Sequence, residues 1–372
     1  MIFKATASNL LEGLNIVTRA LPVRSINKAT EYVLFETDSD SLTMTCTDGS
    51  LTIQTIVSAE IEEPGNCLMP GRLLADFVRK LPDETILFSI NQNFMASIRC
   101  GKSRSNISGL NPADFPEINE VTDLISISVQ ENTLKKMISK VIFSAATTES
   151  KQIVAGVLFE QTNEDIRMVA LDGFRLAIQM DRDHHESSNP GKAFRCIIPT
   201  KTIGEISKII TETEESAKIC FDSNCMRIFT GRTIITSTLL NGSFMDYRRI
   251  IKNEFFTKVV INKQQLLDSM ERASLLAREG RNNVVRFKIK DDTLVVSSKA
   301  EQGNFLEDIP VELSGEPIEI AFNPKYVIDA IKNIDDDDNS DVQMNFRSNM
   351  NPMIIRDEEN QLYLYLILPI RV

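Results

Sequence analysis

Three stretches of the chain share one pattern, in which an apolar strand is followed by a proline and then by an amphipathic helix. The prolines are Pro70, Pro199 and Pro324, and they stand 129 and 125 residues apart. Proline suits a helix start because its fixed φ matches the helix and its missing N–H is not needed there. This period is too long for a solenoid repeat and matches the size of a domain. The pattern therefore predicts three copies of one domain-sized unit.

A second helix precedes each of these three. Leu10, Leu134 and Leu266 occupy equivalent places in it, 124 and 132 residues apart, and a short apolar strand comes before each. The runs between the helices alternate apolar and polar residues, as in SLTMTCTD at 41–48, which is the signal of half-buried strands. We therefore predict an α+β fold of three tandem copies, over residues 1–121, 122–252 and 253–372. The predicted helical windows are 7–21, 70–81, 131–143, 199–211, 262–278 and 322–334.

Composition indicates where the protein is located and whether its cysteines bind a metal. Apolar runs stay shorter than the roughly 18 residues that a membrane-spanning helix needs, and the N-terminus lacks a signal-peptide layout. The expected location is the cytoplasm. Six cysteines are present without a CxxC pair, which predicts buried reduced thiols rather than a structural zinc site.

Charge is distributed unevenly along the chain. The net charge is −11, yet the six helical windows together carry +7, which leaves −18 for the rest. In the helix at 131–143, Lys135, Lys136 and Lys140 are expected to face away from the apolar stripe. A charged helix face is usually only a solvated surface. If the helices face a common direction, however, they form a basic surface that attracts phosphates without reading sequence. Basic pairs seven residues apart, which share one helix face, are Arg72 and Arg79, Lys201 and Lys208, and Lys325 and Lys332.

The sequence offers no constellation of catalytic residues. The two histidines, His184 and His185, lie in a polar stretch that is typical of a surface loop. Gly101-Lys102-Ser103 resembles the end of a phosphate-binding loop, but Ala96 stands where that loop needs glycine. The acidic run at 335–338 is expected to be a solvated turn. We therefore predict no catalytic site, no metal and no cofactor.

Five short motifs, in order along all three copies, resemble the bacterial DNA sliding clamps, the β subunits of DNA polymerase III. The motifs are LNPADFP at 110–116, LDGFRLA at 171–177, DYRR at 246–249, FNPKY at 322–326 and LPIRV at 368–372. The resemblance covers the whole chain. It implies a head-to-tail homodimeric ring with helices lining a central hole and sheets outside. Such a ring encircles duplex DNA and tethers the replicative polymerase without a catalytic site of its own.

The resemblance also implies partners and the residues that meet them. The implied partners are the DNA polymerase III alpha subunit, the clamp loader delta subunit, other polymerases and mismatch-repair proteins, all docking in one peptide pocket. The residues that the resemblance and the charge pattern assign to DNA are Arg24, Arg72, Arg79, Lys136, Lys140, Lys151, Lys201, Lys208, Lys325 and Lys332. The dimer contact would use Arg104, Ile107, Leu275 and Leu276, with Ile107 inserted into the partner.

The implied peptide pocket has two parts that share the C-terminal strand. One part comprises Val154, Leu171, Gly173, Phe174, Arg175, Leu176, Met245, Arg249 and Ile250. The other comprises Asn323, Tyr326 and Met350, and the shared strand is Leu366, Ile367, Leu368, Pro369, Ile370 and Arg371. Leu171, Phe174 and Met245 depart from the residues common in the family, which makes the pocket more apolar and leaves its peptide preference open.

Two other functional classes stay open from the residues alone. A β-rich scaffold that does not encircle DNA would share the repeat but would have no use for the basic helix faces. An enzyme such as a nuclease would need clustered carboxylates with a metal, and the sequence lacks that pattern.

Overall fold

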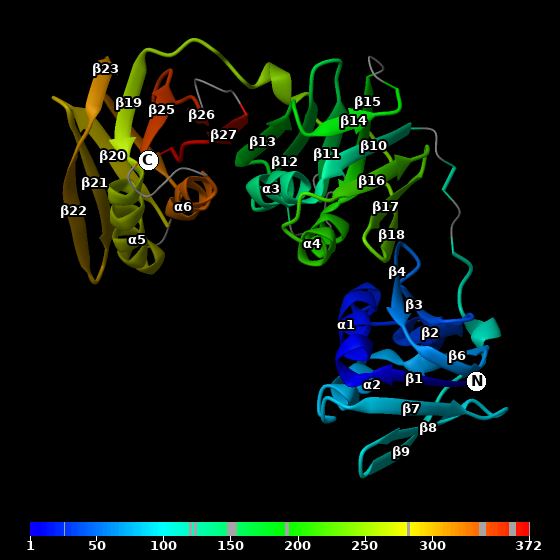
Figure 1. Cartoon of the computed structure of the whole chain (residues 1–372). Helices are drawn as coiled ribbons and strands as arrows, with labels where there is room; N and C mark the ends of the chain where they lie inside the picture. Colours follow the sequence, from blue (N-terminus) through cyan, green and yellow to red (C-terminus); the bar gives the residue numbers. More distant parts are fainter. Residues whose placement is uncertain are drawn as a thin grey trace. The chain divides into compact units, whose positions relative to one another are not determined.

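The structure is a computed structural model that describes residues 1–25, 27–118, 121–122, 125–146, 155–189, 193–280, 283–334, 340–356 and 362–371 (Figure 1). The chain forms two compact units. The first contains Met1–Asn132, His185–Pro190 and Glu205–Leu239, and the second contains Thr133–His184, Gly191–Gly204 and Leu240–Val372. Each unit is built from antiparallel sheets with helices packed on them, as the alternating runs predict.

The first unit contains a five-stranded and a nine-stranded sheet. The smaller sheet has the order β5 (Glu60–Glu63), β1 (Ile2–Thr6), β7 (Thr85–Ile90), β8 (Met95–Cys100) and β9 (Ser103–Ser108). The larger has the order β14 (His185–Ser187), β10 (Ile125–Gln130), β16 (Ser216–Phe221), β17 (Cys225–Thr230), β18 (Thr233–Thr238), β4 (Leu51–Ser58), β3 (Ser41–Thr47), β2 (Tyr32–Thr37) and β6 (Gly65–Pro70).

Two helices of the first unit pack together, α1 (Ala7–Val17) and α2 (Gly71–Val78). The Thr6 side chain caps α1 by accepting a hydrogen bond from the Asn9 N–H, and Leu10 and Leu14 are fully buried. Gly13 allows α1 to approach β4 closely, because a Cβ there would lie 2.5 Å from a methyl carbon of Val57. Short 3₁₀ helices are η1 (Thr18–Ala20), η2 (Lys28–Glu31) and η3 (Pro112–Asp114).

The second unit also contains two sheets. The nine-stranded sheet has the order β15 (Phe194–Pro199), β11 (Gly156–Gln161), β12 (Ile166–Leu171), β13 (Arg175–Asp181), β27 (Tyr363–Ile367), β26 (Met353–Arg356), β25 (Asp341–Phe346), β19 (Thr257–Asn262) and β23 (Glu312–Gly315). The four-stranded sheet has the order β22 (Gly303–Pro310), β21 (Thr293–Ala300), β20 (Val285–Lys290) and β24 (Ile318–Phe322).

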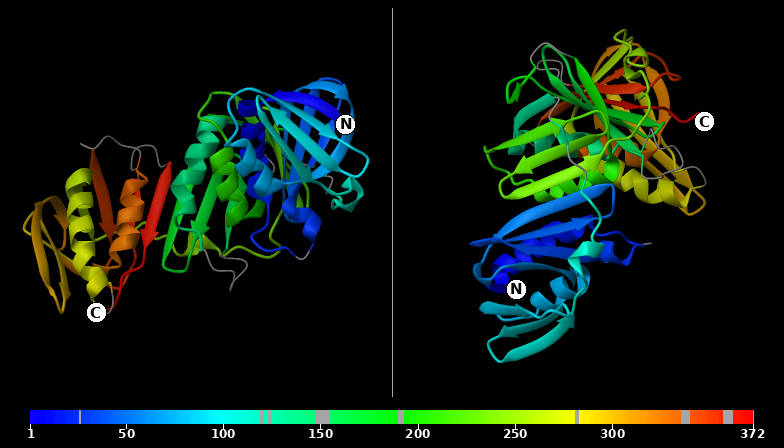
Figure 2. Two further views of the ribbon diagram at one scale, coloured as in Figure 1. Left: turned by 90° about the horizontal axis from the view of Figure 1, so that it is seen from below. Right: turned by 90° about the vertical axis from the view of Figure 1, so that its right-hand side faces the viewer.

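Helices α5 (Lys263–Glu279) and α6 (Pro324–Lys332) pack side by side in the second unit, as Figure 2 shows in its left view. The side chain of Asn323 caps α6, and Pro324 occupies its first turn, as the proline pattern predicts. The remaining helices, α3 (Glu131–Ile142) and α4 (Thr200–Ile209), are each divided between the units, and the 3₁₀ helix η4 spans Tyr247–Arg249. All six predicted helical windows thus contain a helix.

Both nine-stranded sheets continue across the predicted joins between the three copies. In the first unit β18 pairs with β4, so that Ile235 lies opposite Ile53. In the second unit β13 pairs with β27, so that Ala177 lies opposite Tyr365. These ladders join strands of neighbouring copies by backbone hydrogen bonds.

All six cysteines lie in strands. All six cysteines are free thiols, and five are buried. The polar stretch around the histidines was expected to be a loop, but His185 begins the short strand β14, which pairs with β10. No group of three or more potential metal ligands gathers among the described residues, and no helix among them could span a membrane.

Candidate functional site

A cavity of about 360 Å³ lies in the second unit, where η4, the start of β13 and the C-terminal strand meet. We call it the apolar groove. Most of its lining side chains are aliphatic or aromatic, which is typical of a site that takes up apolar side chains. The lining residues are Leu171, Gly173, Phe174, Arg175, Leu176, Met245, Arg249, Ile250, Lys252, Phe255, Arg347, Asn351, Pro352, Ile354, Leu366 and Leu368.

The floor of the groove belongs to the core of the nine-stranded sheet. Leu176 on β13 lies opposite Leu366 on β27, and Leu366 in turn lies opposite Ile354 on β26. All three side chains are buried in one hydrophobic cluster. The floor is therefore rigid, because its residues are fixed by three paired strands as well as by packing.

A tight turn before β13 places Phe174 at the mouth. Gly173 has φ of 93°, a left-handed conformation that side chains disfavour. The carboxylate of Asp172 accepts hydrogen bonds from the N–H groups of Phe174 and Arg175. The N–H of Leu368 donates to the carbonyl of Phe174 at 2.9 Å. The backbone of Phe174 is thus held on both sides, while its side chain stays 58% exposed.

Arg175 joins α6 to the turn beneath the groove. Its guanidinium donates to Asp172 Oδ2 at 2.9 Å, to Asp329 Oδ2 at 2.5 Å and to the carbonyl of Phe143 at 2.5 Å. The same group lies 4.6 Å from the ring centre of Tyr326. Arg175 is only 8% exposed, so its positive charge is largely buried. The carboxylates of Asp172 and Asp329 balance this charge.

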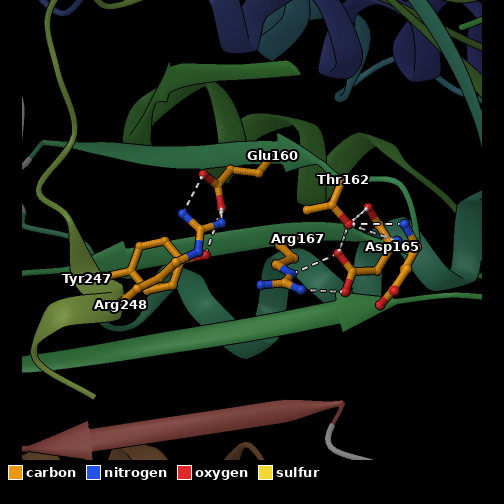
Figure 3. Close-up of polar contacts among 7 residues, drawn as sticks. Glu160, Thr162, Asp165, Arg167, Tyr247 and Arg248 are labelled. Atoms are coloured by element: carbon orange, nitrogen blue, oxygen red, sulfur yellow. Dashed lines mark hydrogen bonds and ion pairs between the residues drawn. The ribbon is translucent and has the colours of Figure 1, made fainter. Parts of the chain in front are cut away.

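One wall of the groove is formed by the segment around η4, which a buried polar network fixes to β11 (Figure 3). The hydroxyl of Tyr247 donates to Glu160 Oε2 at 2.7 Å, and Arg248 Nη2 donates to the same oxygen at 2.9 Å. Burial, followed by the adjacent Glu160 carboxylate, raises the pKa of Tyr247 to about 12. Nearby, Asp165 accepts two hydrogen bonds from Arg167 and one from Thr162.

The groove brings together ten of the residues that the sequence assigns to the peptide pocket. They are Leu171, Gly173, Phe174, Arg175, Leu176, Met245, Arg249, Ile250, Leu366 and Leu368. The second predicted part does not line this cavity. Tyr326 instead stacks on Phe174 with ring centres 6.1 Å apart, Asn323 caps α6, and Met350 is 57% exposed.

The rest of the predicted C-terminal strand also lies off the cavity. Ile367 is buried, and the N–H of Ile370 donates to the carbonyl of Ala321. Pro369 and Arg371 do not line it, and Val154 lies outside the described residues.

Six further lining residues are not predicted from the sequence: Lys252, Phe255, Arg347, Asn351, Pro352 and Ile354. Lys252 and Phe255 follow the DYRR motif by a few residues, so extending that motif toward β19 would have found them. Arg347, Asn351 and Pro352 lie in the turn between β25 and β26. Met350, which the sequence analysis places in the other part of the pocket, belongs to the same turn, so its neighbours in sequence were the available signal.

The predicted DNA-binding residues are mostly exposed. Arg72 donates to the carbonyl of Pro22, and Arg79 pairs with Asp76 at 2.7 Å. Lys208 pairs with Glu205 and Lys332 with Glu271, and each lysine keeps about half of its side chain exposed (55% and 52%). Arg24, Lys136, Lys201 and Lys325 are also exposed, and Lys151 lies outside the described residues.

Lys140 corrects the expectation that the lysines of α3 face solvent. It is only 3% exposed, and its ammonium lies 5.2 Å from the ring centre of Tyr363. The long stem of lysine can be buried against apolar surface, and an aromatic face attracts its charge. Lys140 is therefore not an accessible contact for phosphate in this structure.

The predicted dimer residues lie at two separate places. Leu275 on α5 is 64% exposed and Leu276 is half-buried. Arg104 is exposed on β9, the edge strand of the five-stranded sheet. Ile107, on the same strand, is only 8% exposed, because the alternation of β9 turns it toward the core of its own sheet. The expectation that Ile107 is free to insert into a partner is corrected on this ground.

Comparisons with known proteins cover the chain. Family models for the DNA polymerase III beta subunit match its N-terminal domain at residues 1–119, its central domain at 128–246 and its C-terminal domain at 248–371. The beta sliding clamp of Bacillus subtilis (strain 168) is 28% identical over 383 residues, with both chains fully covered. That of Staphylococcus epidermidis is 30% identical over 381 residues, covering 100% of this chain and 99% of the relative.

A solved structure agrees with these matches. The DNA polymerase sliding clamp from Bacillus subtilis has a TM-score of 0.94 to this chain at 27% identity, covering 100% of this chain and 99% of that one. Sequence and fold thus agree over the whole length. The chain belongs to the DNA polymerase III beta subunit family, the beta sliding clamps.

Proposed function

We propose that this chain is a sliding clamp, two copies of which close head to tail around duplex DNA and tether the replicative polymerase. The observation that carries the proposal is the match of three beta-subunit domains, in order, over the chain. Members of this family are accessory processivity factors and are not themselves catalytic. The expected compartment is the cytoplasm, where the six free thiols would stay reduced.

Exposed basic side chains on the helices and nearby loops support the contact with DNA. Side chains that touch phosphates position a protein on DNA without reading its sequence, which suits a ring that slides. Because the ion pairs of Arg79 with Asp76 and of Lys332 with Glu271 are solvent-exposed and weak, these two basic groups can exchange their partners for phosphates. Lys208 keeps 55% of its side chain exposed, although its partner Glu205 is only 17% exposed. The proposed contacts are Arg24, Arg72, Arg79, Lys136, Lys201, Lys208, Lys325 and Lys332.

An exposed apolar residue and an open sheet edge support closure of the ring. Leu275 exposes an aliphatic side chain on α5, and β9 is an edge strand, with no further strand paired to its outer side in the described part of the chain. Such features favour pairing with another chain. We assign Leu275 and Leu276 to one side of the contact and Arg104 on β9 to the other.

The apolar groove supports docking of partner peptides. Its lining offers buried aliphatic surface beside a few polar groups, the arrangement that anchors the large side chains of an extended peptide. The proposed partners are the DNA polymerase III alpha subunit, the clamp loader delta subunit, other polymerases and mismatch-repair proteins.

One experiment tests the topological function. The protein is loaded by a clamp loader onto nicked circular duplex DNA, separated from free protein by gel filtration, and challenged by cutting the circle. We expect the protein to stay on the circle and to leave once it is linear. Retention on open-ended linear DNA would contradict encirclement, and failure to load at all would favour the scaffold that does not encircle DNA.

A further inference from the structure

The charged side chains that line the apolar groove are all basic. They are Arg175, Arg249, Lys252 and Arg347, and no carboxylate among the residues that the structure describes lines the cavity. This is unexpected in a chain with a net charge of −11. A groove of one sign in an acidic protein favours an occupant of the opposite sign.

Arg175 does not contribute to this excess at the mouth. It is only 8% exposed, and its hydrogen bonds to Asp172 and Asp329 balance its charge. The cations that an occupant can reach are Arg249, Lys252 and Arg347.

The three accessible cations are weakly held within the protein. Arg249 pairs with Asp246 at 2.9 Å, but the two side chains are 86% and 53% exposed. Arg347 pairs with Glu254 at 3.3 Å, and that carboxylate is 76% exposed. Lys252 is exposed and forms no ion pair with any residue that the structure describes. Exposed pairs contribute little and are readily exchanged, so all three cations are available to a ligand.

We propose that the apolar groove selects an extended peptide whose large apolar side chains are flanked by aspartate or glutamate, with Lys252 and Arg347 as the selecting residues. This inference rests on the proposed docking function and names the chemistry of the occupant. The apolar side chains would supply most of the affinity by leaving water, whereas the carboxylates would choose among peptides with similar apolar residues.

The first test compares two synthetic peptides that share the same apolar residues. One has two flanking aspartates and the other has asparagines in their places. Fluorescence anisotropy with the full-length protein should give about tenfold tighter binding of the acidic peptide at low salt, since each exposed pair contributes about two- to fivefold. The difference should shrink as salt is added, because exposed charges are screened.

The second test changes the protein. The double variant Lys252→Glu and Arg347→Glu should lose the preference for the acidic peptide or reverse it, and the readout is the ratio of the two peptide affinities within each protein. Lys288→Glu is the matched control, because Lys288 is exposed on β20 of the same unit but does not line the groove. This control should leave the preference unchanged.

The outcomes separate this inference from the function on which it rests. Equal binding of the two peptides, or a preference that survives the double variant, would overturn the assignment of Lys252 and Arg347 and leave the docking function intact. Binding of neither peptide, with the thermal transition of the protein unchanged, would count against docking in this groove altogether.

Discussion

Replacing Tyr247 with phenylalanine should loosen the wall of the apolar groove while keeping its packing. The substitution removes one hydroxyl, which is buried and donates to Glu160 Oε2 at 2.7 Å. The ring remains in the hydrophobic cluster and stays beside the Arg248 guanidinium, which lies 4.8 Å from its centre. The change therefore removes the hydrogen bond that fixes η4 to β11, together with the interaction of the same hydroxyl with Arg167 on β12.

The expected loss of stability follows from the partners of Glu160. A hydrogen bond to a charged group contributes about 1.5–3 kcal/mol. Glu160 would keep its bond from Arg248 Nη2 at 2.9 Å, so its carboxylate is not left unpaired and the lower value, about 1.5 kcal/mol, applies. For a folding unit of 150–250 residues this corresponds to a fall in Tm of about 3–6 °C.

Differential scanning calorimetry and hydrogen exchange measure the effect. Tyr32→Phe is the matched control, because the Tyr32 hydroxyl has no hydrogen bond to any described residue. Amide exchange over residues 244–251 should accelerate in Tyr247→Phe and not in the control. Equal losses of stability in the two variants, with equal amide exchange over residues 244–251, would show that the Glu160–Tyr247 network does not hold the groove wall in place.

Four further outcomes are expected, one from a pH series and three from changes to other residues. The pKa of Tyr247 is raised to about 12 from an ordinary 10. The protonated hydroxyl therefore stabilises the folded protein fully below pH 10, and this contribution is lost between pH 10 and 12. In denaturant unfolding, the difference in free energy of unfolding between wild type and Tyr247→Phe should therefore become smaller from pH 10 to pH 12. Deleting residues 368–372 should abolish binding of an apolar peptide without dissociating the dimer; unchanged affinity would contradict the proposed groove. Replacing Leu275 and Leu276 with aspartate should give monomers in sedimentation, and a persistent dimer would place the interface elsewhere. Lys201→Glu with Lys208→Glu should speed loss of the loaded protein from nicked circles as salt rises, measured against Lys288→Glu.

Local patterns in the sequence predicted the helices well. The prolines at 70, 199 and 324 stand at or beside the starts of α2, α4 and α6, because proline's geometry acts through its immediate neighbours. Ten groove residues followed from the resemblance to the sliding clamps, and seven of them lie within the short motifs that carry it. The side-chain partners could not be predicted in the same way. Lys140 lies over Tyr363, which is 223 residues away, and the turn with Arg347 reaches the groove only through the ladder of β25, β26 and β27.

The two ladders that cross the predicted joins limit how the protein can be divided. A fragment that ends at residue 121 would lose β18 and leave β4 with an open edge, including the partly exposed Ile56. A fragment that begins at residue 253 would strip β13 from β27 in the same way. Open, apolar edges recruit other strands, so such fragments should aggregate. The three copies repeat in sequence, but each depends on its neighbour for the strand that protects it from aggregation.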